Sequence, residues 1–392
     1  MQRSSERVLT SHAGSLPRTE GLVELNRAKF AGQPYDRNAY PACLAAAVED
    51  ICRKQAETGV DVINDGEFGK TTRDTIDYGA WQSYAWSRLG GWEYGEVRDM
   101  PHMTGRRDRE KFADFYRGLN TPKLSSTTPA SGRPQVFTGP IKYIGQPALR
   151  ADLENFQAAL ARVNAAEGFM TSVAPGSFGR RQYEYYKSDE EFLFALAEAM
   201  REEYKSIIEA GFILQLDDPG LPDTWDLVNP EPSIDEYKKY AMVRIEALNH
   251  GLRDLPEDRI RYHICWGSWH GPHTTDLPLK DIADVMLKVR AGAFSVEAGN
   301  VRHEHEWKVW RDLKLPEGKI LIPGVVSHAT NVVEHPEVVA DRILRYANAA
   351  GRENIIAGTD CGLGGRIHPQ LVWAKLEALV KGARMASEEL WR

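Results

Sequence analysis

The sequence predicts an α/β fold, a (β/α)8 TIM barrel, and three observations lead to this prediction. Short apolar runs bounded by Gly, Pro and Asp alternate with amphipathic helical stretches along most of the chain. The length of 392 residues suits one barrel domain that carries an insertion. Polar and reactive residues follow most of the predicted strands, as in a barrel whose strand ends form one rim where chemistry takes place.

Nine segments have the composition of buried strands, one more than the barrel needs. We expect Val136–Tyr143 to be the extra strand, outside the barrel or at its rim, so that Phe169–Val173 is the third barrel strand. The predicted strands are Val8–Ser11, Val60–Asp65, Val136–Tyr143, Phe169–Val173, Phe212–Asp217, Ile260–Cys265, Ala293–Glu297, Ile320–Val325 and Asn354–Thr359. The predicted helices include Tyr40–Thr58, Ala148–Ala166, Asp189–Ala210, Ile234–Gly251, Leu279–Ala291 and Pro336–Ala350.

The segment 77–134, after the second predicted strand, breaks this alternation. It contains several aromatic residues, then a charged helical stretch near Asp108–Leu119, then a region rich in Ser, Thr and Pro. We interpret it as an insertion in a single barrel domain that spans residues 1–392. Two interpretations stay open: an aromatic lid over the active site, or a packing arm at a subunit interface. The second is compatible with a homo-oligomer.

The composition excludes several classes of protein. Hydrophobic residues make up 42% and charged residues 27% of the chain, which is typical of a globular domain. The formal net charge of −7 gives no electrostatic support for nucleic-acid binding. No run of about 18 apolar residues is present, so no membrane span is expected. The polar N-terminus lacks the apolar stretch of a signal peptide, and we therefore expect a cytoplasmic protein with reduced thiols.

The four cysteines fall into two pairs with different surroundings. Cys43 and Cys52 lie in an alanine-rich helical stretch, where inert cysteines are expected. Cys265 and Cys361 directly follow or end predicted strands, beside other polar residues. Because the carboxyl ends of barrel strands meet at one rim, these residues should converge in space. The polar strand ends are Ser11–Ser15, Asn64–Glu67, Asp217–Pro219, His263–Trp266, Glu297–Asn300, Ser327–His328 and Asp360–Gly362.

The spacing of His263 and Cys265 predicts a metal site. Side chains at positions i and i+2 of a strand face the same side, so both donors can reach one ion. Cys361 would reach it from the last strand, and Glu297 from the strand that follows the His/Cys strand. Two thiolates, an imidazole and a carboxylate suit Zn²⁺ in tetrahedral geometry. The alternative is a buried histidine with two unrelated core cysteines.

With these residues in place, the sequence resembles the catalytic barrel of cobalamin-independent methionine synthase. The resemblance extends to short, single-barrel relatives, which include epoxyalkane:coenzyme M transferase. It rests on Ser-His-Ala-Gly-Ser-Leu-Pro-Arg at Ser11–Arg18, on Asp-Cys-Gly-Leu-Gly-Gly-Arg at Asp360–Arg366, and on the His-x-Cys motif. The zinc ligands that the resemblance implies are His263, Cys265, Glu297 and Cys361.

The resemblance also implies how a substrate thiol would be bound. Gly14 and Ser15 would hold the carboxylate of an amino-acid thiol. Glu67, in Asp-Gly-Glu, and Asp217, in Asp-Asp-Pro, would bind its amino group. Trp266 follows the zinc motif directly and is expected to contact the substrate, although the stretch that it begins differs from the methionine synthases.

The implied catalytic groups are His328, as a proton relay, and Asp217. His270 and His273 also lie near predicted strand ends and could deliver a proton. By contrast, His303 and His305 are expected in a solvated loop beyond the seventh strand.

Together these residues predict a zinc-dependent alkyl or methyl transfer to a thiol. A thiol has a pKa of roughly 8.5, and coordination to zinc deprotonates it. The expected partners are a small-molecule thiol and an electrophilic alkyl donor. Three alternatives stay open: an epoxide–thiol transferase or lyase, a metal-independent decarboxylase of the same barrel superfamily, and a zinc-binding barrel without turnover. The large N-terminal domain of full-length synthases and a folate-binding signature are both absent from the sequence given.

Overall fold

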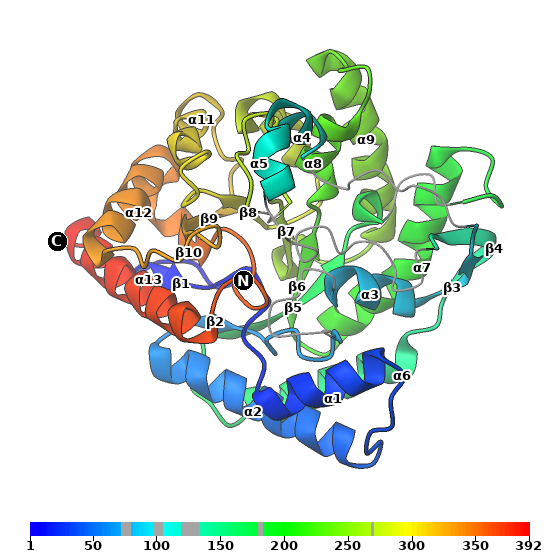
Figure 1. Ribbon diagram of the computed structural model, residues 1–392. Helices are drawn as coiled ribbons and strands as arrows, with labels where there is room; N and C mark the ends of the chain where they lie inside the picture. Colours follow the sequence, from blue (N-terminus) through cyan, green and yellow to red (C-terminus); the bar gives the residue numbers. More distant parts are fainter. Residues whose placement is uncertain (72–79, 97–104, 119–132, 179–182, 268–269) are drawn as a thin grey trace.

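Eight parallel strands form the barrel that the sequence predicts (Figure 1). The computed structural model describes residues 1–392 apart from 72–79, 97–104, 119–132, 179–182 and 268–269. Around the sheet the order is β1-β10-β9-β8-β7-β6-β5-β2, and the backbone N–H of Asp61 donates to the Thr10 carbonyl at 3.2 Å beside the β1–β2 junction. The barrel strands are β1 (Leu9–Thr10), β2 (Val62–Ile63), β5 (Glu167–Val173), β6 (Ile213–Asp217), β7 (Ile260–His263), β8 (Ala293–Glu297), β9 (Ile320–Val326) and β10 (Ile356–Thr359).

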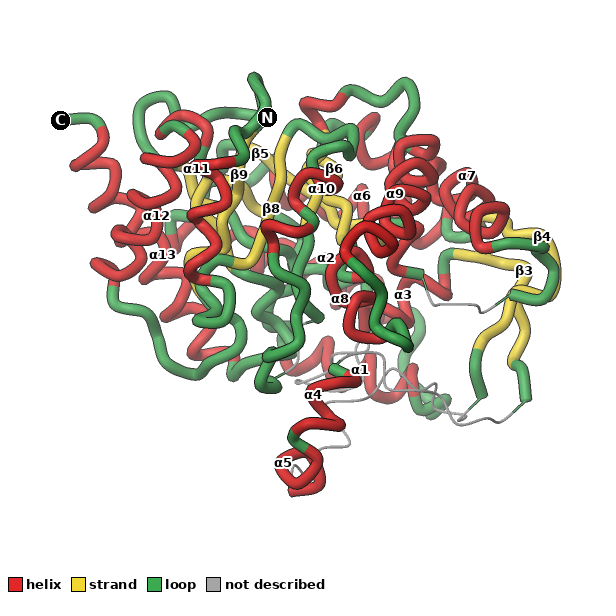
Figure 2. Tube along the Cα trace, turned by 90° about the horizontal axis from the view of Figure 1, so that it is seen from above, coloured by secondary structure: helices red, strands yellow, loops and turns green. Residues whose placement is uncertain are grey.

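Helices surround the strands on the outside, as Figure 2 shows. Two long helices begin at serine caps: Ser188 accepts from the Glu191 N–H, and Ser233 forms a capping box with Glu236. The first long outer helix ends at Gly59, whose φ of 93° is left-handed. No helix in the described part of the chain could span a membrane. The helices outside the insertion are α1 (Glu20–Phe30), α2 (Ala39–Thr58), α6 (Gln146–Leu160), α7 (Asp189–Glu209), α8 (Gly220–Leu227), α9 (Ile234–Gly251), α10 (Ala283–Met286), α11 (Val309–Asp312), α12 (Pro336–Ala350) and α13 (Pro369–Leu390).

A buried arginine ties the inside of the barrel together. Arg261 of β7 donates to Gln215 Oε1 at 2.7 Å, to Ser11 Oγ at 2.9 Å and to the His12 carbonyl at 2.7 Å. Burial lowers the pKa of Arg261 to about 9, so the side chain stays charged at neutral pH. Its guanidinium carbon lies 3.4 Å from the centre of the Phe169 ring. Arg261 therefore fixes β6 relative to the segment after β1, and both lead to the candidate site.

The prediction of an extra strand is confirmed. β4 (Gln135–Tyr143) pairs antiparallel with β3 (Leu89–Tyr94) in a separate two-stranded sheet, and β5 takes the third place in the barrel. The continuous helix predicted at Leu279–Ala291 is wrong. A 3-10 turn at Leu279–Asp281 precedes the short α10, and Ile282 between them has φ −131°, outside the helical region.

The first part of the insertion packs through its aromatic residues. It contains α3 (Ala80–Ser87) and β3, and the ring of Trp86 stacks on Phe137 of β4 with centroids 5.0 Å apart. Trp86 also packs edge-on against Phe178, beyond β5. These contacts attach the insertion to the barrel as part of the core. Its role as a lid or as an interface arm stays a prediction, and much of segment 77–134 lies outside the described residues.

The second part of the insertion docks on loops at the rim. Its elements are α4 (Arg106–Lys111) and α5 (Ala113–Gly118), which in Figure 2 project from the end of the barrel opposite the N-terminus. The carboxylate of Asp108 is fully buried and accepts from the N–H of Thr274 at 3.1 Å and from its hydroxyl at 2.6 Å. The N–H of Arg107 donates to Asp226 of α8 at 3.2 Å. α4 therefore bridges the loops that follow β6 and β7.

Replacement Asp108→Ala should release α4 from the rim. The Thr274 N–H and hydroxyl would lose their acceptor, and each buried unpaired group costs about 1–3 kcal/mol. We expect proteolysis near residue 108 to become at least tenfold faster, while the thermal midpoint of the barrel changes little. Limited proteolysis followed by mass spectrometry measures this. Asp114→Ala, at an exposed position of α5, is the matched control and should cleave like the parent protein. Equal cleavage of both variants would show that Asp108 does not anchor α4.

Candidate metal and substrate site

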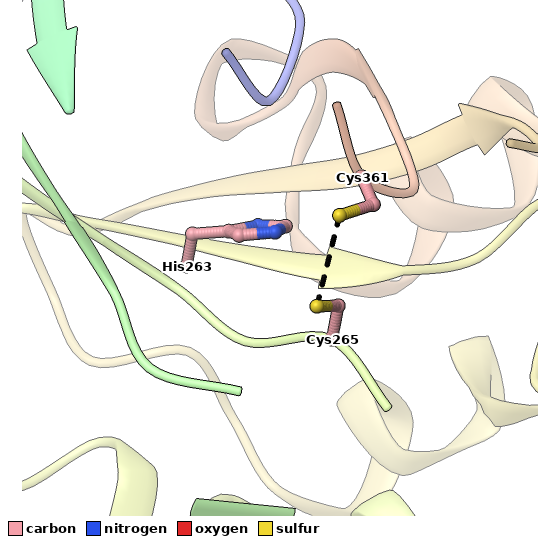
Figure 3. Close-up of side chains that lie close together, drawn as sticks. All are labelled: His263, Cys265 and Cys361. Atoms are coloured by element: carbon pink, nitrogen blue, oxygen red, sulfur yellow. Dashed lines mark hydrogen bonds between the residues drawn. The ribbon is translucent and has the colours of Figure 1, made fainter. Parts of the chain in front are cut away.

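Three of the four predicted metal ligands come together at the carboxyl ends of the barrel strands. His263 ends β7, Cys265 lies two residues further, and Cys361 follows β10. The two sulfurs are 3.7 Å apart, and a ring nitrogen of His263 completes a group whose donor atoms all lie within 4.8 Å of one another. Figure 3 shows the imidazole pointing toward the two sulfurs. All three residues are buried.

The spacing of these donors fits a zinc ion. Two sulfurs bound tetrahedrally at about 2.3 Å from zinc are about 3.8 Å apart, whereas a disulfide brings them to about 2.05 Å. The observed distance of 3.7 Å is that of the metal geometry. His263 Nδ1 lies 3.0 Å from the Ser295 hydroxyl of β8, while its Nε2 is buried and no described residue hydrogen-bonds to it. If Nδ1 donates to Ser295, the Nε2 lone pair is free for a metal.

The electrostatics of the sulfurs favour one thiolate. Hydrogen bonding to Cys265 holds the pKa of Cys361 well below its usual range, and the charge of Arg366 acts in the same direction. The pKa of Cys265 is raised by the hydrogen bond to Cys361 and by burial. Burial alone would lower the pKa of His263, but the nearby Cys361 sulfur and the charge of Asp217 outweigh burial and raise it. The cluster is therefore an anionic, proton-sharing group of a kind that binds soft cations.

Glu297, the fourth predicted ligand, is not part of this three-residue group in the structure. Its Oε1 accepts from the backbone N–H of Trp266 at 2.9 Å, and its Oε2 accepts from Asn300 Nδ2 at 3.2 Å. It is nevertheless close enough that its charge raises the pKa of Cys265. Glu297 forms a neighbouring group with His328 and Asp360, so the carboxylate lies at the border of the sulfur cluster.

The predicted proton relay, His328, is fully buried in this neighbouring group. No described residue hydrogen-bonds to either ring nitrogen, and burial lowers the pKa of His328, which keeps the imidazole neutral. Asp360 accepts from the N–H groups of Ala298 and Gly299 at 2.7 and 2.8 Å. Burial and the charge of Glu297 raise the pKa of Asp360 well above its usual range. A neutral imidazole beside buried carboxyl groups can accept or release a proton.

The predicted carboxylate-binding and amino-binding residues surround the same opening. A Cβ atom on Gly14, whose φ is +127°, would lie 2.4 Å from Glu67 Oε1, so Gly14 lets the Glu67 carboxylate approach its backbone. Ser15 packs against Gly362, next to Cys361. Glu67 Oε1 accepts from the Thr171 hydroxyl at 2.8 Å. The loop after β1 thus lies between the Glu67 carboxylate and the sulfur cluster.

Glu67 also has a buried cation beside it that the sequence prediction did not include. Lys70 Nζ lies 3.5 Å from Glu67 Oε1 and donates to Thr171 at 2.5 Å. Asp217 of β6 accepts from Gln215 Nε2 at 2.6 Å. Burial raises the pKa of Asp217 to about 6, against the opposing charges of His263 and Lys70. Asp217 is therefore close enough to interact electrostatically with both His263 and the Glu67–Lys70 pair.

The structure corrects the prediction for one further histidine. His303 is buried and lies between two carboxylates, whereas a solvated loop was expected; His305 is exposed, as predicted. The ring of Trp266 stacks on His303 with centroids 3.9 Å apart, so one face of the indole is already covered. Substrate contact by Trp266 stays a prediction. His273 bonds to Asp276, and burial lowers the pKa of His270.

The fold and the site define a (β/α)8-barrel protein with a buried Cys2His cluster where its strands end. Residues 147–385 match the model of a family described as cobalamin-independent synthase, catalytic domain. The chain therefore belongs to this family, and the resemblance found in the sequence is confirmed.

Two individual proteins align with nearly the whole chain. A methionine synthase of Thermococcus kodakarensis is 23% identical over 389 residues, which are 98% of this chain and 94% of that protein. A methionine synthase of Sulfurisphaera tokodaii is 25% identical over 388 residues, 97% of this chain and 93% of that protein. The chain is accordingly an enzyme of the thiol S-methyltransferase class.

A solved structure shares the fold. The B12-independent methionine synthase of Shewanella sp. W3-18-1 matches with a TM-score of 0.69 and 19% identity, covering 98% of this chain and 99% of that one. The likeness confirms the barrel fold.

The carboxyl group of Asp65, beside this site, should make stability depend on pH. Asp65 is buried next to a cavity of about 20 Å³, and burial and the charge of Asp152 raise its pKa to about 7. The unfolded chain releases this proton near pH 4, so between about pH 4 and pH 7 rising pH favours unfolding by up to about 1.4 kcal/mol per pH unit. Asp65→Asn removes this effect. The free energy of unfolding of the variant relative to the parent should therefore rise over that range and level off above pH 7.

Chemical denaturation at several pH values measures the difference. Asp61→Asn is the control, because it removes a carboxylate that pairs with Arg7 and does not line the cavity. A difference for Asp65→Asn that stays constant from pH 4 to pH 8 would show that Asp65 has an ordinary pKa.

Proposed function

We propose that this enzyme is a zinc-dependent methyltransferase that acts on an amino-acid thiol of the homocysteine type. The observation that carries the proposal is the pair of buried sulfurs 3.7 Å apart, with the unpaired Nε2 of His263 beside them. The relatives named methionine synthase support the substrate class, since they align over nearly the full chain. The methyl donor is an electrophilic small molecule.

His263, Cys265 and Cys361 would hold the ion, with Glu297 as the candidate fourth ligand. Zinc bound there would lower the pKa of a substrate thiol and present its sulfur as a nucleophile at neutral pH. The hydrogen bond between His263 and Ser295 fixes the imidazole so that Nε2 faces the sulfurs. Each Glu297 oxygen accepts one hydrogen bond, from Trp266 or from Asn300, and each keeps a further lone pair with which it could bind the ion.

The substrate's polar end would bind on the opposite side of the opening. Glu67 Oε1 is committed to Thr171 and Lys70, while no described residue donates to Oε2. We assign Oε2 to the substrate ammonium, with Asp217 as its second acceptor. The backbone and hydroxyl at Gly14 and Ser15 would receive the carboxylate. This arrangement places the thiol toward Cys361, because Ser15 packs directly beside the Cys361 loop.

His328 is the proposed proton acceptor. Methyl transfer forms a sulfur–carbon bond, breaks the bond between the methyl carbon and the donor, which keeps the electron pair, and releases the thiol proton to a base or to the departing donor. A neutral, buried imidazole with two unpaired nitrogens is suited to take that proton. Asp217, with its raised pKa, is the second candidate.

Metal content tests the ligand set. The parent protein should bind about one zinc ion per chain, and Cys265→Ser and Cys361→Ser should each weaken zinc binding at least tenfold because a thiolate ligand is lost. Elemental analysis and chelator competition measure this. Cys52→Ser, in the buried part of α2, is the matched control and should keep full zinc content. Stoichiometric zinc in both rim variants, or none in the parent, would refute the proposed site.

Thiol binding tests the polar end of the site. Glu67→Gln should weaken the binding of homocysteine to the zinc-loaded protein about 10- to 100-fold, since a charged hydrogen bond contributes about 1.5–3 kcal/mol. Binding of 4-mercaptobutanoate, which lacks the amino group, should change less than threefold. Titration calorimetry with both thiols measures the two affinities. An equal loss for both thiols would show that Glu67 does not recognise the ammonium.

A further inference from the structure

A second buried cluster of ionisable side chains lies behind the Cys2His group. His303 Nδ1 is 3.0 Å from Glu306 Oε2, and His303 Nε2 is 2.9 Å from Asp276 Oδ2. The same Asp276 oxygen is 2.8 Å from His273 Nδ1. We call these four residues the His303 network. His303, Asp276 and Glu306 each expose 5% or less of their side chains.

Geometry alone gives the protonation state of His303. Ionised carboxylates only accept hydrogen bonds, so both ring nitrogens of His303 must donate, and the ring is an imidazolium. Its pKa is raised to about 10, because the bonds to Asp276 and Glu306 outweigh the effect of burial. Nitrogen and oxygen ligands of a tetrahedral ion would be about 3.4 Å apart. The distances of 2.8 to 3.0 Å are those of hydrogen bonds, so protons hold this cluster together.

The imidazolium lies against the indole that follows the zinc motif. The rings of His303 and Trp266 are nearly parallel, with 20° between their planes and centroids 3.9 Å apart. A cation stacked on an indole is stabilised by attraction to the ring electrons, and more strongly when both are buried. The loop that begins at Trp266 is also held at its far end. Trp266 Nε1 donates to the Leu277 carbonyl at 2.8 Å, and Glu306 Oε1 accepts from the Leu279 N–H at 2.7 Å.

This stack joins the two loops that hold Glu297. Trp266, after β7, donates its backbone N–H to Glu297 Oε1, and Asn300, after β8, donates its side-chain amide to Glu297 Oε2. His303 belongs to the second loop, since its N–H donates to the Asn300 carbonyl at 2.9 Å. Stacking of His303 on Trp266 thus sets the distance between the two donors of one carboxylate.

We propose that His303 is a positioning residue, a buried imidazolium that holds Trp266 and thereby fixes the carboxylate of Glu297 at the edge of the Cys2His cluster. The network acts through Trp266 rather than on the metal ligands directly. Its effect on zinc passes through the Trp266 N–H and depends on the proposed metal site, whereas its effect on the loop does not.

Hydrogen exchange and nitrogen NMR test the network without zinc. In His303→Gln, peptides that contain Trp266 should exchange at least tenfold faster, while peptides from α12 and α13 keep the parent rates. His305→Gln, two residues away and exposed, is the matched control and should change neither. In protein labelled with ¹⁵N-histidine, one imidazolium signal should persist to pH 8.5 and disappear in His303→Gln alone.

Zinc affinity tests the connection to the metal site. Removing a group that orients a ligand typically weakens metal binding 10- to 100-fold, and we expect about tenfold for His303→Gln and less than twofold for His305→Gln. If His303→Gln does not fold, Asp276→Asn, which removes one of the two carboxylates, should give the same changes to a smaller extent. Unchanged exchange at Trp266, or zinc affinity equal to the parent, would overturn the proposal. If the parent binds no zinc, the proposed function fails, and exchange and NMR still decide whether His303 holds Trp266.

Discussion

The site depends on closure of the barrel, which brings Cys265 and Cys361 together across 96 residues of sequence. Neither sulfur has a favourable environment by itself, because a thiolate in an apolar interior is costly unless a cation or a donor is near. Strands β7 and β10 are separated in the sheet by β8 and β9, so the contact is made across the inside of the ring. The buried interior therefore maintains an anionic sulfur pair and an unpaired imidazole nitrogen that an open sheet would not keep in contact.

Several buried carboxyl groups lie at the rim of this barrel. Burial raises the pKa values of Asp65, Asp217 and Asp360, which means that each carboxyl group resists further ionisation in its surroundings. Within the described part of the rim, Lys70 interacts with Glu67 and Thr171. His303 is hydrogen-bonded to the carboxylates of Asp276 and Glu306. A cation bound from outside would stabilise the negative charges of these groups. The divalent ion proposed at the sulfurs and the ammonium group proposed at Glu67 would both have this effect.

Sequence reasoning found those parts of the fold and site that local periodicity and motifs determine. Alternation along a strand correctly put His263 and Cys265 on one side, and the late Asp-Cys-Gly stretch correctly placed Cys361 at the same rim. The extra strand was identified because it fell outside the regular spacing of strand and helix. These features need only a few neighbouring residues, and so a single sequence contains them.

The features that the sequence did not predict involve contacts between segments far apart in the chain. Arg302-His303-Glu304-His305-Glu306 looks like a solvated run, yet Asp276, 27 residues earlier in the chain, draws His303 inside. The pairing of Lys70 with Glu67 and Thr171 was not predicted, because Thr171 lies 101 residues from Lys70 in the chain. The bonds that direct Glu297 toward Trp266 and Asn300 likewise come from two loops whose approach only the folded barrel defines. Even the break at Ile282 depends on how the chain meets its neighbours, since residues 279–291 have a helical pattern.

Asp360 gives the site a mechanical property. It directly precedes Cys361, and its side chain accepts hydrogen bonds from the N–H groups of Ala298 and Gly299, which directly follow Glu297. A pull on the Cys361 sulfur is therefore transmitted through one side chain to the backbone that carries Glu297. The Cys361 thiolate and the Glu297 carboxylate therefore cannot move independently. A cation that attracts the thiolate would also shift the carboxylate.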